Sequence, residues 1–145
     1  MIQTPRVGVV GAGSLGFHHI RILRDLRGAQ FTGFVESNPD RRREVEKELK
    51  VRSHPTLDAL LDASDAVIIV VPTSQHFAVA SAAIERGKHV FIEKPITATL
   101  EEADALLDLA KKRGVIVQIG HIERFNRAVR AALPHVKSPR FIDSE

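Results

Sequence analysis

The sequence predicts an α/β fold built on a doubly wound, mostly parallel sheet. Short apolar runs that suit strands alternate along the chain with longer segments that have one apolar face and suit helices. The run at residues 66–71 (A-V-I-I-V-V) is apolar without interruption, which is typical of a parallel strand buried on both faces. A G-x-G-x-x-G pattern at residues 11–16 directly follows one apolar run and precedes a helical pattern. Alternating units of this kind pair their strands in parallel and place helices on both sides of the sheet.

The composition limits the class of protein. The 145 residues suffice for one domain with its own core, and the hydrophobic content of 43% and charged content of 27% are ordinary for a globular protein. The net charge is +3, acids and bases are interleaved, and Trp and Tyr are absent, so a nucleic-acid partner is disfavoured. The absence of cysteine excludes disulfides and thiolate metal sites.

The sequence also bears on cellular location. Residues 1–5 have neither the basic start nor the apolar stretch of a signal peptide. The longest apolar run, residues 66–72, is too short to cross a bilayer. We therefore expect a cytoplasmic protein without a membrane partner.

Helix caps help to place the individual elements. Asn38 suits an N-cap position and Pro39 the first turn of a mostly polar helix, which we expect in solvent at the sheet edge. Thr99 and Glu102 form a capping-box pattern that starts a helix ending at Gly114. In chain order, the expected strands are residues 7–10, 30–35, 51–54, 66–71, 89–93, 115–119 and the start of one at 140–143, and the expected helical segments are 15–27, 39–50, 56–61, 75–86, 99–113 and 123–133.

Each glycine of the G-x-G-x-x-G pattern has a physical explanation. Gly11 allows a tight turn out of the strand, Gly13 lets the backbone approach a pyrophosphate, and Gly16 lets the helix pack closely. The N–H groups and dipole at the helix start favour phosphate. Glu36 ends the next apolar run, about 20 residues after Gly16, where this fingerprint has a carboxylate for the adenosine ribose. The predicted fold is therefore the Rossmann fold, and its predicted cofactor contacts in these two loops are Gly11, Ala12, Gly13, Ser14, Leu15, Gly16, Glu36 and Ser37.

The choice between the two nicotinamide cofactors depends on Glu36 and its neighbours. A carboxylate repels the additional phosphate of NADP, so Glu36 favours NAD. Arg41, Arg42 and Arg43 leave an alternative open, because an arginine near the ribose could accept that phosphate; otherwise they form a solvated basic helix face. The sequence thus predicts NAD, with NADP as the less favoured cofactor and Arg41 among the cofactor-binding candidates.

The loops after the later strands supply further candidates, because ligands of doubly wound sheets bind at the carboxyl ends of strands. Pro72, Thr73 and His76 are expected on the nicotinamide side, where His76 contacts cofactor or substrate or else caps the next helix. His18 and His19 have no carboxylate or cysteine at metal-ligand spacing, so we expect them to be structural and expect no metal site.

Four segments at these positions resemble a known family. They are G-A-G-S-L-G at 11–16, V-P-T-S-Q-H at 71–76, G-K-H-V-F-I-E-K-P-I-T at 87–97 and G-H-I-E-R-F-N at 120–126. Together they resemble the nucleotide-binding half of the glucose–fructose oxidoreductase/inositol dehydrogenase (Gfo/Idh/MocA) family over residues 6–126. The resemblance implies NAD(P)-dependent oxidation or reduction of sugars, inositols and related polyols. Sugar-nucleotide dehydrogenases that act at sugar carbon three are the first members to compare.

The resemblance also implies a domain organisation. Residues 1–122 correspond to the Rossmann domain, and residues 123–145 to the start of a second α/β domain, most of which would be missing. In the family this domain shapes the substrate pocket and often mediates oligomerisation, so a homo-oligomer is expected. Arg127 departs from the family, because many members have proline there. The resemblance therefore supports cofactor binding more than complete catalysis by this chain alone.

Lys94 is the catalytic candidate by resemblance and by position. It follows a buried strand and precedes Pro95. Its ammonium can hydrogen-bond the substrate oxygen and stabilise the alkoxide-like charge that forms during hydride transfer, and partial burial would make it a candidate acid or base. By resemblance, Glu93, Lys94 and Arg124 are also cofactor-binding candidates. Arg124 is otherwise a surface charge at a helix start.

Two alternatives to a complete dehydrogenase stay open. A Rossmann domain of this size could be a non-catalytic module that senses NAD or coenzyme A, which the chain length favours and the Glu93-Lys94-Pro95 motif disfavours. The chain could also be the N-terminal piece of a longer enzyme. An exposed sheet edge and apolar patch would then lead to self-association.

Overall fold

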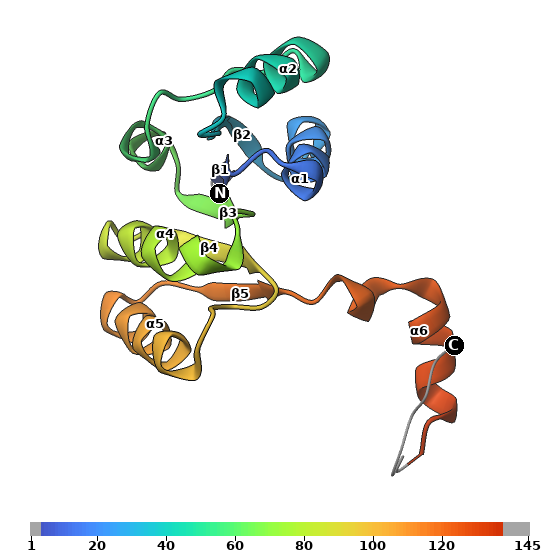
Figure 1. The fold of residues 1–145 in the computed structure, drawn as a ribbon. Helices are drawn as coiled ribbons and strands as arrows, with labels where there is room; N and C mark the ends of the chain where they lie inside the picture. Colours follow the sequence, from blue (N-terminus) through green and yellow to red (C-terminus); the bar gives the residue numbers. More distant parts are fainter. Residues whose placement is uncertain (1–3, 138–145) are drawn as a thin grey trace.

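A five-stranded parallel sheet forms the centre of the molecule, as predicted (Figure 1). The computed structural model describes residues 4–137. The strand order is β2-β1-β3-β4-β5, so the first strand lies inside the sheet and the second at one edge. The strands are β1 (Arg6–Val10), β2 (Gln30–Val35), β3 (Ala66–Ile69), β4 (His89–Glu93) and β5 (Val117–Gly120).

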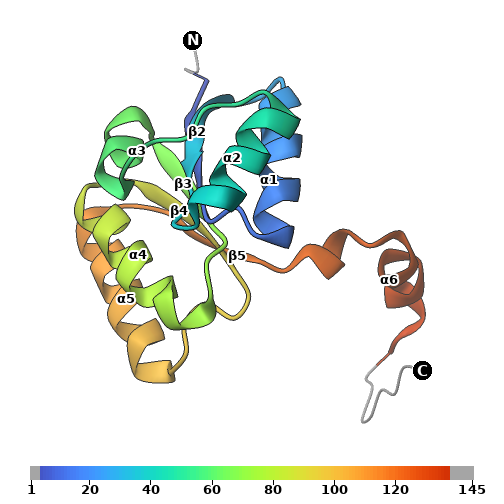
Figure 2. The ribbon, with the colours of Figure 1, turned by 45° about the horizontal axis from the view of Figure 1, so that its top comes forward.

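Helices cover the two faces of the sheet, which makes it doubly wound (Figures 1 and 2). Helices α1 and α2 pack on one face, and α3, α4 and α5 on the other. Each crossover runs from the carboxyl end of one strand to the start of the next, as parallel pairing requires. The helices are α1 (Ser14–Asp25), α2 (Pro39–Leu49), α3 (Leu57–Ala63), α4 (Thr73–Glu85), α5 (Leu100–Arg113) and α6 (Arg127–Ala132), with 3₁₀ turns η1 (Ile122–Phe125) and η2 (Leu133–His135).

Alternation along the strands divides the apolar residues between two cores. On β1, Val9 faces the core under α1 and α2, and Val10 faces the core under α3, α4 and α5. The run at 66–71 behaves as predicted: Val67 and Ile69 enter one core, and Ile68 packs against the other. The helices contribute Ile20, Leu23, Val45 and Leu49 to the first core, and Leu60, Leu61, Ala80, Ala83, Ile84, Leu106 and Ala110 to the second.

The strand expected at residues 51–54 does not form. Only Ser53 pairs, through a single bridge to Phe34 of the edge strand β2. Strand β2 is bulged here, since Thr32 is an extra residue relative to β1 and Gly33 has a φ of 123°. Pro55, which follows, has no N–H group with which to continue a ladder. The sheet therefore has five strands within residues 4–137.

The helix expected at 123–133 is broken at Asn126. Residues Ile122–Phe125 form the 3₁₀ turn η1, and Asn126 then caps α6 by accepting a hydrogen bond from the N–H of Ala128 at 2.9 Å. This part stands apart from the sheet and its covering helices (Figures 1 and 2). The strand expected at 140–143 lies outside the described residues. Of the helices within residues 4–137, none combines the length and apolar character needed to cross a bilayer.

Candidate dinucleotide-binding site

Two glycines of the loop between β1 and α1 are required by the backbone conformation and packing of the loop. Gly11 has a φ of 94°, and a Cβ there would lie 2.5 Å from the carbonyl oxygen of Val70. A Cβ on Gly16 would lie 2.2 Å from the carbonyl oxygen of Gly11, so the first turn of α1 packs directly on the loop. Any side chain at either position would displace backbone, which explains both residues without reference to a ligand.

Gly13 differs, because the protein does not require a glycine there. Its φ is −59°, which any residue can adopt, and a Cβ would have no protein atom within 4 Å. It sits at the N-cap of α1, whose first turn has no acidic residue. The bare backbone is thus open to an anion at the positive end of a helix. This arrangement fits the pyrophosphate of a dinucleotide.

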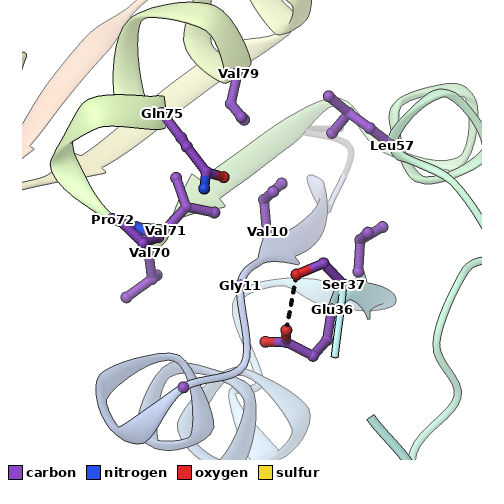
Figure 3. A pocket seen from close by; sticks show the side chains of 12 residues that line it. Val10, Gly11, Glu36, Ser37, Leu57, Val70, Val71, Pro72, Gln75 and Val79 are labelled. Carbon is purple, nitrogen blue, oxygen red and sulfur yellow. Dashed lines mark hydrogen bonds between the residues drawn. The ribbon is translucent and has the colours of Figure 1, made fainter. Parts of the chain in front are cut away.

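A cleft of about 350 Å³ opens beside this loop at the carboxyl ends of β1, β2 and β3 (Figure 3). Its walls are mostly apolar, and Glu36 and Ser37 contribute the polar groups on the β2 side. Of the predicted cofactor contacts, the cleft contains Gly11, Gly13, Glu36, Ser37 and Pro72. The other lining residues were not among the predicted contacts; they are Val10, Val35, Leu57, Val70, Val71, Gln75 and Val79.

Glu36 is tied to the glycine loop. Its Oε2 accepts a hydrogen bond from the N–H of Ala12 at 2.8 Å, and its Oε1 accepts one from the N–H of Asn38 at 2.9 Å. Ser37 donates to the same Oε1 at 3.3 Å, the contact drawn in Figure 3. The carboxylate therefore shapes the loop as well as contributing negative charge to the cleft.

Arg41 also contacts the loop rather than extending into solvent. Its Nε donates to the carbonyl oxygen of Ala12 at 2.8 Å, and its guanidinium lies over the ring of Phe17 at 5.4 Å from the centroid. A second nitrogen donates to Glu44 at 2.8 Å. Ser14 and Leu15, in the first turn of α1, are exposed.

Lys94 lies at a second hollow, beyond β4. This hollow measures about 280 Å³, is lined by Lys94 and residues 121–124, and shares no lining residue with the first cleft. Arg124 lines it too, so the two cations predicted near the cofactor are brought together. Lys94 is exposed within the described chain, so the partial burial expected from its position is not found there.

Eight predicted contacts line neither hollow, namely Ala12, Ser14, Leu15, Gly16, Arg41, Thr73, His76 and Glu93. His76 is buried, with 2% of its surface exposed, and its ring nitrogens lie 2.8 Å from the Pro95 carbonyl oxygen and 2.9 Å from that of Val71. It does not cap α4, whose N-cap is Pro72. Glu93 is buried against His19. Thr73 is the first residue of α4.

Three of the seven lining residues that were not predicted come from helices. Leu57 belongs to α3 and Val79 to α4, and both lie on the core-facing side of their helices. Apolar periodicity marks such residues only as core. Gln75 and Val71 were detectable, since both lie in the V-P-T-S-Q-H segment at 71–76, at the end of the buried run.

The geometry agrees with a family comparison. A family model described as "Oxidoreductase family, NAD-binding Rossmann fold" (GFO_IDH_MocA) matches residues 5–121. The chain belongs to the Gfo/Idh/MocA oxidoreductase family. Its glycine loop, Glu36 and Lys94 all lie within the matched residues. The resemblance stated from the four sequence segments is therefore confirmed.

Three proteins to which this family member is similar are two dehydrogenases and a reductase. UDP-N-acetylglucosamine 3-dehydrogenase of Acidithiobacillus ferrooxidans is 43% identical over 141 residues, and its crystal structure covers 90% of this chain with a TM-score of 0.81. The scyllo-inositol 2-dehydrogenase (NAD(+)) of Bacillus subtilis is 38% identical over 127 residues, or 85% of this chain. Biliverdin reductase from Synechocystis sp., solved with biliverdin and NADP+, is 28% identical, covers 91% of this chain and has a TM-score of 0.81.

The chain spans less than half of the length of these relatives. It covers 44% of the UDP-N-acetylglucosamine 3-dehydrogenase, 37% of the scyllo-inositol dehydrogenase and 43% of the biliverdin reductase. The part of this Gfo/Idh/MocA family member that the family model matches is described as the NAD-binding Rossmann fold. Within residues 4–137, no three His, Asp or Glu side chains are grouped so as to hold a metal ion.

Proposed function

We propose that this chain is the NAD-binding part of a dehydrogenase that transfers hydride between a sugar-like CH–OH group and nicotinamide. The observation that carries the proposal is the pair of hollows at the carboxyl ends of neighbouring strands. The first lies beside the glycine loop, beyond β1, β2 and β3. The second lies beyond β4 and contains Lys94. A dinucleotide has its adenine and its reacting nicotinamide ring at opposite ends, with the pyrophosphate between them, and the two hollows suit these two ends.

The residues of the first cleft would bind and orient the cofactor. The open backbone at Gly13 and the N–H groups of the first α1 turn would hold the pyrophosphate. Glu36 would accept hydrogen bonds from the adenosine ribose and disfavour a phosphate there, which makes NAD the proposed cofactor. The apolar wall formed by Leu57, Val71 and Val79 suits the face of an adenine ring.

The proposed catalytic residue is Lys94. Bound NAD would supply the nicotinamide carbon that accepts or returns the hydride. The Lys94 ammonium would donate a hydrogen bond from Nζ to the substrate oxygen, and would stabilise the negative charge that develops on that oxygen. Arg124, in the same hollow, would add a second positive charge.

A sugar nucleotide is the proposed substrate class. The supporting observation is the 43% identity to a UDP-N-acetylglucosamine 3-dehydrogenase, which extends over 97% of this chain. We further propose that residues from 123 on begin a second domain that completes the substrate pocket, and that the protein is a homo-oligomer in the cytoplasm. The separation of η1 and α6 from the sheet supports the domain boundary.

Substitution of Gly13 tests the cofactor site. Because a Cβ at this position meets no protein atom, Gly13→Ala should leave the thermal midpoint of unfolding unchanged. The methyl group would obstruct the pyrophosphate, so calorimetric titration should show NAD binding weakened about tenfold, equivalent to ~1.4 kcal/mol. The unmodified chain should bind NAD more tightly than NADP.

Gly28→Ala is the matched control. A Cβ on Gly28 also has no protein atom within 4 Å, but this glycine follows α1 at its far end, so NAD binding should not change. Equal NAD affinity in the Gly13 and Gly28 variants would contradict the proposed site. Binding of coenzyme A instead of either dinucleotide would favour a sensor module over the dehydrogenase.

A further inference from the structure

The turn at Glu93–Pro95, which carries Lys94, is anchored from both faces of the sheet. One contact comes from His19 of α1, and the other from His76 of α4 on the opposite face. His19 was expected to be structural, with no partner in the sequence pattern. Its position in the fold gives it a more specific role.

The Glu93 carboxylate is enclosed. Its side chain is 8% exposed, and its Oε1 accepts a hydrogen bond from Nε2 of His19 at 2.8 Å. A Cβ on Gly120 of β5 would lie 2.7 Å from Oε2, so the carboxylate packs directly on the backbone of the edge strand. A buried carboxylate is costly without a hydrogen-bond donor, and His19 provides one.

His19 is itself fixed by its neighbours. Its ring centroid lies 5.8 Å from that of Phe91, which is two residues before Glu93 and therefore on the same face of β4. His19 is also the third residue after Gly16, in the helix that starts at the glycine loop. Helix α1 thus connects the proposed phosphate site to the turn that carries Lys94.

His76 secures the other side of this turn. One ring nitrogen lies 2.8 Å from the carbonyl oxygen of Pro95, and the other lies 2.9 Å from that of Val71. The turns after β3 and β4 are therefore joined through one buried side chain. Because Pro95 is held in this way, the remaining conformational freedom of the Lys94 backbone depends on how firmly Glu93 is held.

We propose that His19 is a positioning residue for Lys94, acting through Glu93. The hydrogen bond from His19 fixes the end of β4 against α1, and so sets where the Lys94 side chain starts. This proposal rests on the proposed function of Lys94. Its consequence is selective: loss of His19 should disturb the nicotinamide end of the site and leave the phosphate and adenine end unchanged.

The test compares two ligands and three variants of the 145-residue chain. NADH and ADP-ribose share the adenine and pyrophosphate, but only NADH has the nicotinamide. In His19→Leu, NADH binding should weaken about tenfold, as for a lost hydrogen bond to a charged group, while ADP-ribose binding stays unchanged. His19→Gln keeps an N–H donor and should restore NADH binding. His18→Leu, at an exposed position of the same helix, should match the unmodified chain.

Amide hydrogen exchange of the ligand-free variants gives a second measurement. Exchange at the Lys94 N–H should accelerate about tenfold in His19→Leu and return to normal in His19→Gln. Unchanged exchange, equal weakening of both ligands, or failure of His19→Gln to restore binding would overturn the role of His19. If the unmodified chain bound neither ligand, the proposed function would fail, whereas the exchange result would still decide whether His19 holds the turn.

Discussion

At the scale of single residues, the contact between Arg6 and Asp65 joins the beginnings of β1 and β3. The N–H of Arg6 donates to Asp65 Oδ2 at 2.9 Å, and its guanidinium donates to Oδ1 at 2.6 Å. The backbone N–H of Asp65 donates in return to the carbonyl oxygen of Arg6 at 2.8 Å. Hydrogen bonds from the Arg6 side chain, followed by those from its backbone, lower the pKa of Asp65 to about 2.

This lowered pKa predicts a loss of stability in acid. The native carboxylate is favoured relative to the unfolded chain, so its contribution is complete above the ordinary pKa of 3.8 and disappears as the pH falls toward 2. Both side chains are about 40% exposed, so solvent screening limits the contribution to about 0.5–1 kcal/mol. Urea unfolding of Asp65→Asn should show lower stability than the unmodified chain at neutral pH, and this difference should shrink as the pH falls through about 2.

A matched substitution distinguishes loss of the Arg6–Asp65 ion pair from the general effect of removing one negative charge. Asp108→Asn removes one exposed carboxylate from α5 and should leave the free energy of unfolding unchanged within error at neutral pH. A difference for Asp65→Asn that is as large at pH 2 as at neutral pH would show that the ion pair is not its cause.

At the scale of elements, the start of α5 shows how closely a local pattern specifies structure. Thr99 Oγ1 accepts a hydrogen bond from the N–H of Glu102 at 3.2 Å, as the capping-box pattern predicts. Glu102 reaches back one residue beyond the N-cap and accepts from the N–H of Ala98 at 3.1 Å, whereas a capping box uses the N–H of the N-cap residue itself. Hydrogen bonds from its own backbone and from Thr99 lower the pKa of Glu101 in the same turn.

Removal of this cap should destabilise the domain measurably. Thr99→Ala leaves the Glu102 N–H without its side-chain acceptor and should lower the free energy of unfolding by about 1 kcal/mol. Thr99→Ser keeps the acceptor oxygen and should retain most of this stability. Chemical denaturation measures both, and equal loss in the two variants would indicate that the methyl group rather than the cap matters.

The elements that the sequence predicted well are those specified locally. Gly114 ends α5 in the left-handed conformation, and the G-x-G-x-x-G loop lies between β1 and α1, because both depend on a few adjacent residues. The absence of a strand at 51–54 depends on a bulge in β2, which lies about 20 residues earlier in the chain. Local propensity cannot carry such information.

The residues of the candidate site also fall into two groups, those that the local sequence predicts and those that depend on distant parts of the fold. Gly11, Gly13 and Glu36 could be predicted from spacing, and they line one cleft. Their apolar partners across the cleft come from α3 and α4, whose approach is fixed only by packing on the sheet. The contact of His19 with Glu93 likewise joins residues 74 positions apart. No periodicity in the sequence marks it.

At the scale of the whole molecule, exposed apolar side chains gather on the segment that leaves the sheet. Phe125 is 77% exposed and Leu133 57%. Ile122, Val129 and Val136 of the same segment are also exposed. Large apolar groups that stand together outside the core favour association, in agreement with the proposed homo-oligomer.

Sedimentation equilibrium would test this association. The unmodified chain should self-associate at high protein concentration, and Leu133→Ser should weaken the association about tenfold by removing a large exposed apolar side chain from this segment. Leu100→Ser is the control, since Leu100 is 81% exposed on α5, away from this segment. A monomer at all concentrations, or equal effects of the two substitutions, would contradict the role assigned to the segment.

The central place of β1 in the sheet has a consequence for synthesis of the chain. Residues Arg6–Val10 pair with Gln30–Val35 on one side and Ala66–Ile69 on the other. A nascent chain therefore exposes one edge of its first strand until about 60 further residues have left the ribosome. Parallel strands close such gaps slowly, because the intervening chain must first be ordered. Among the strand edges that become paired in this sheet, the one on β1 thus waits longest for its partner and has the longest opportunity to meet a chaperone or another nascent chain.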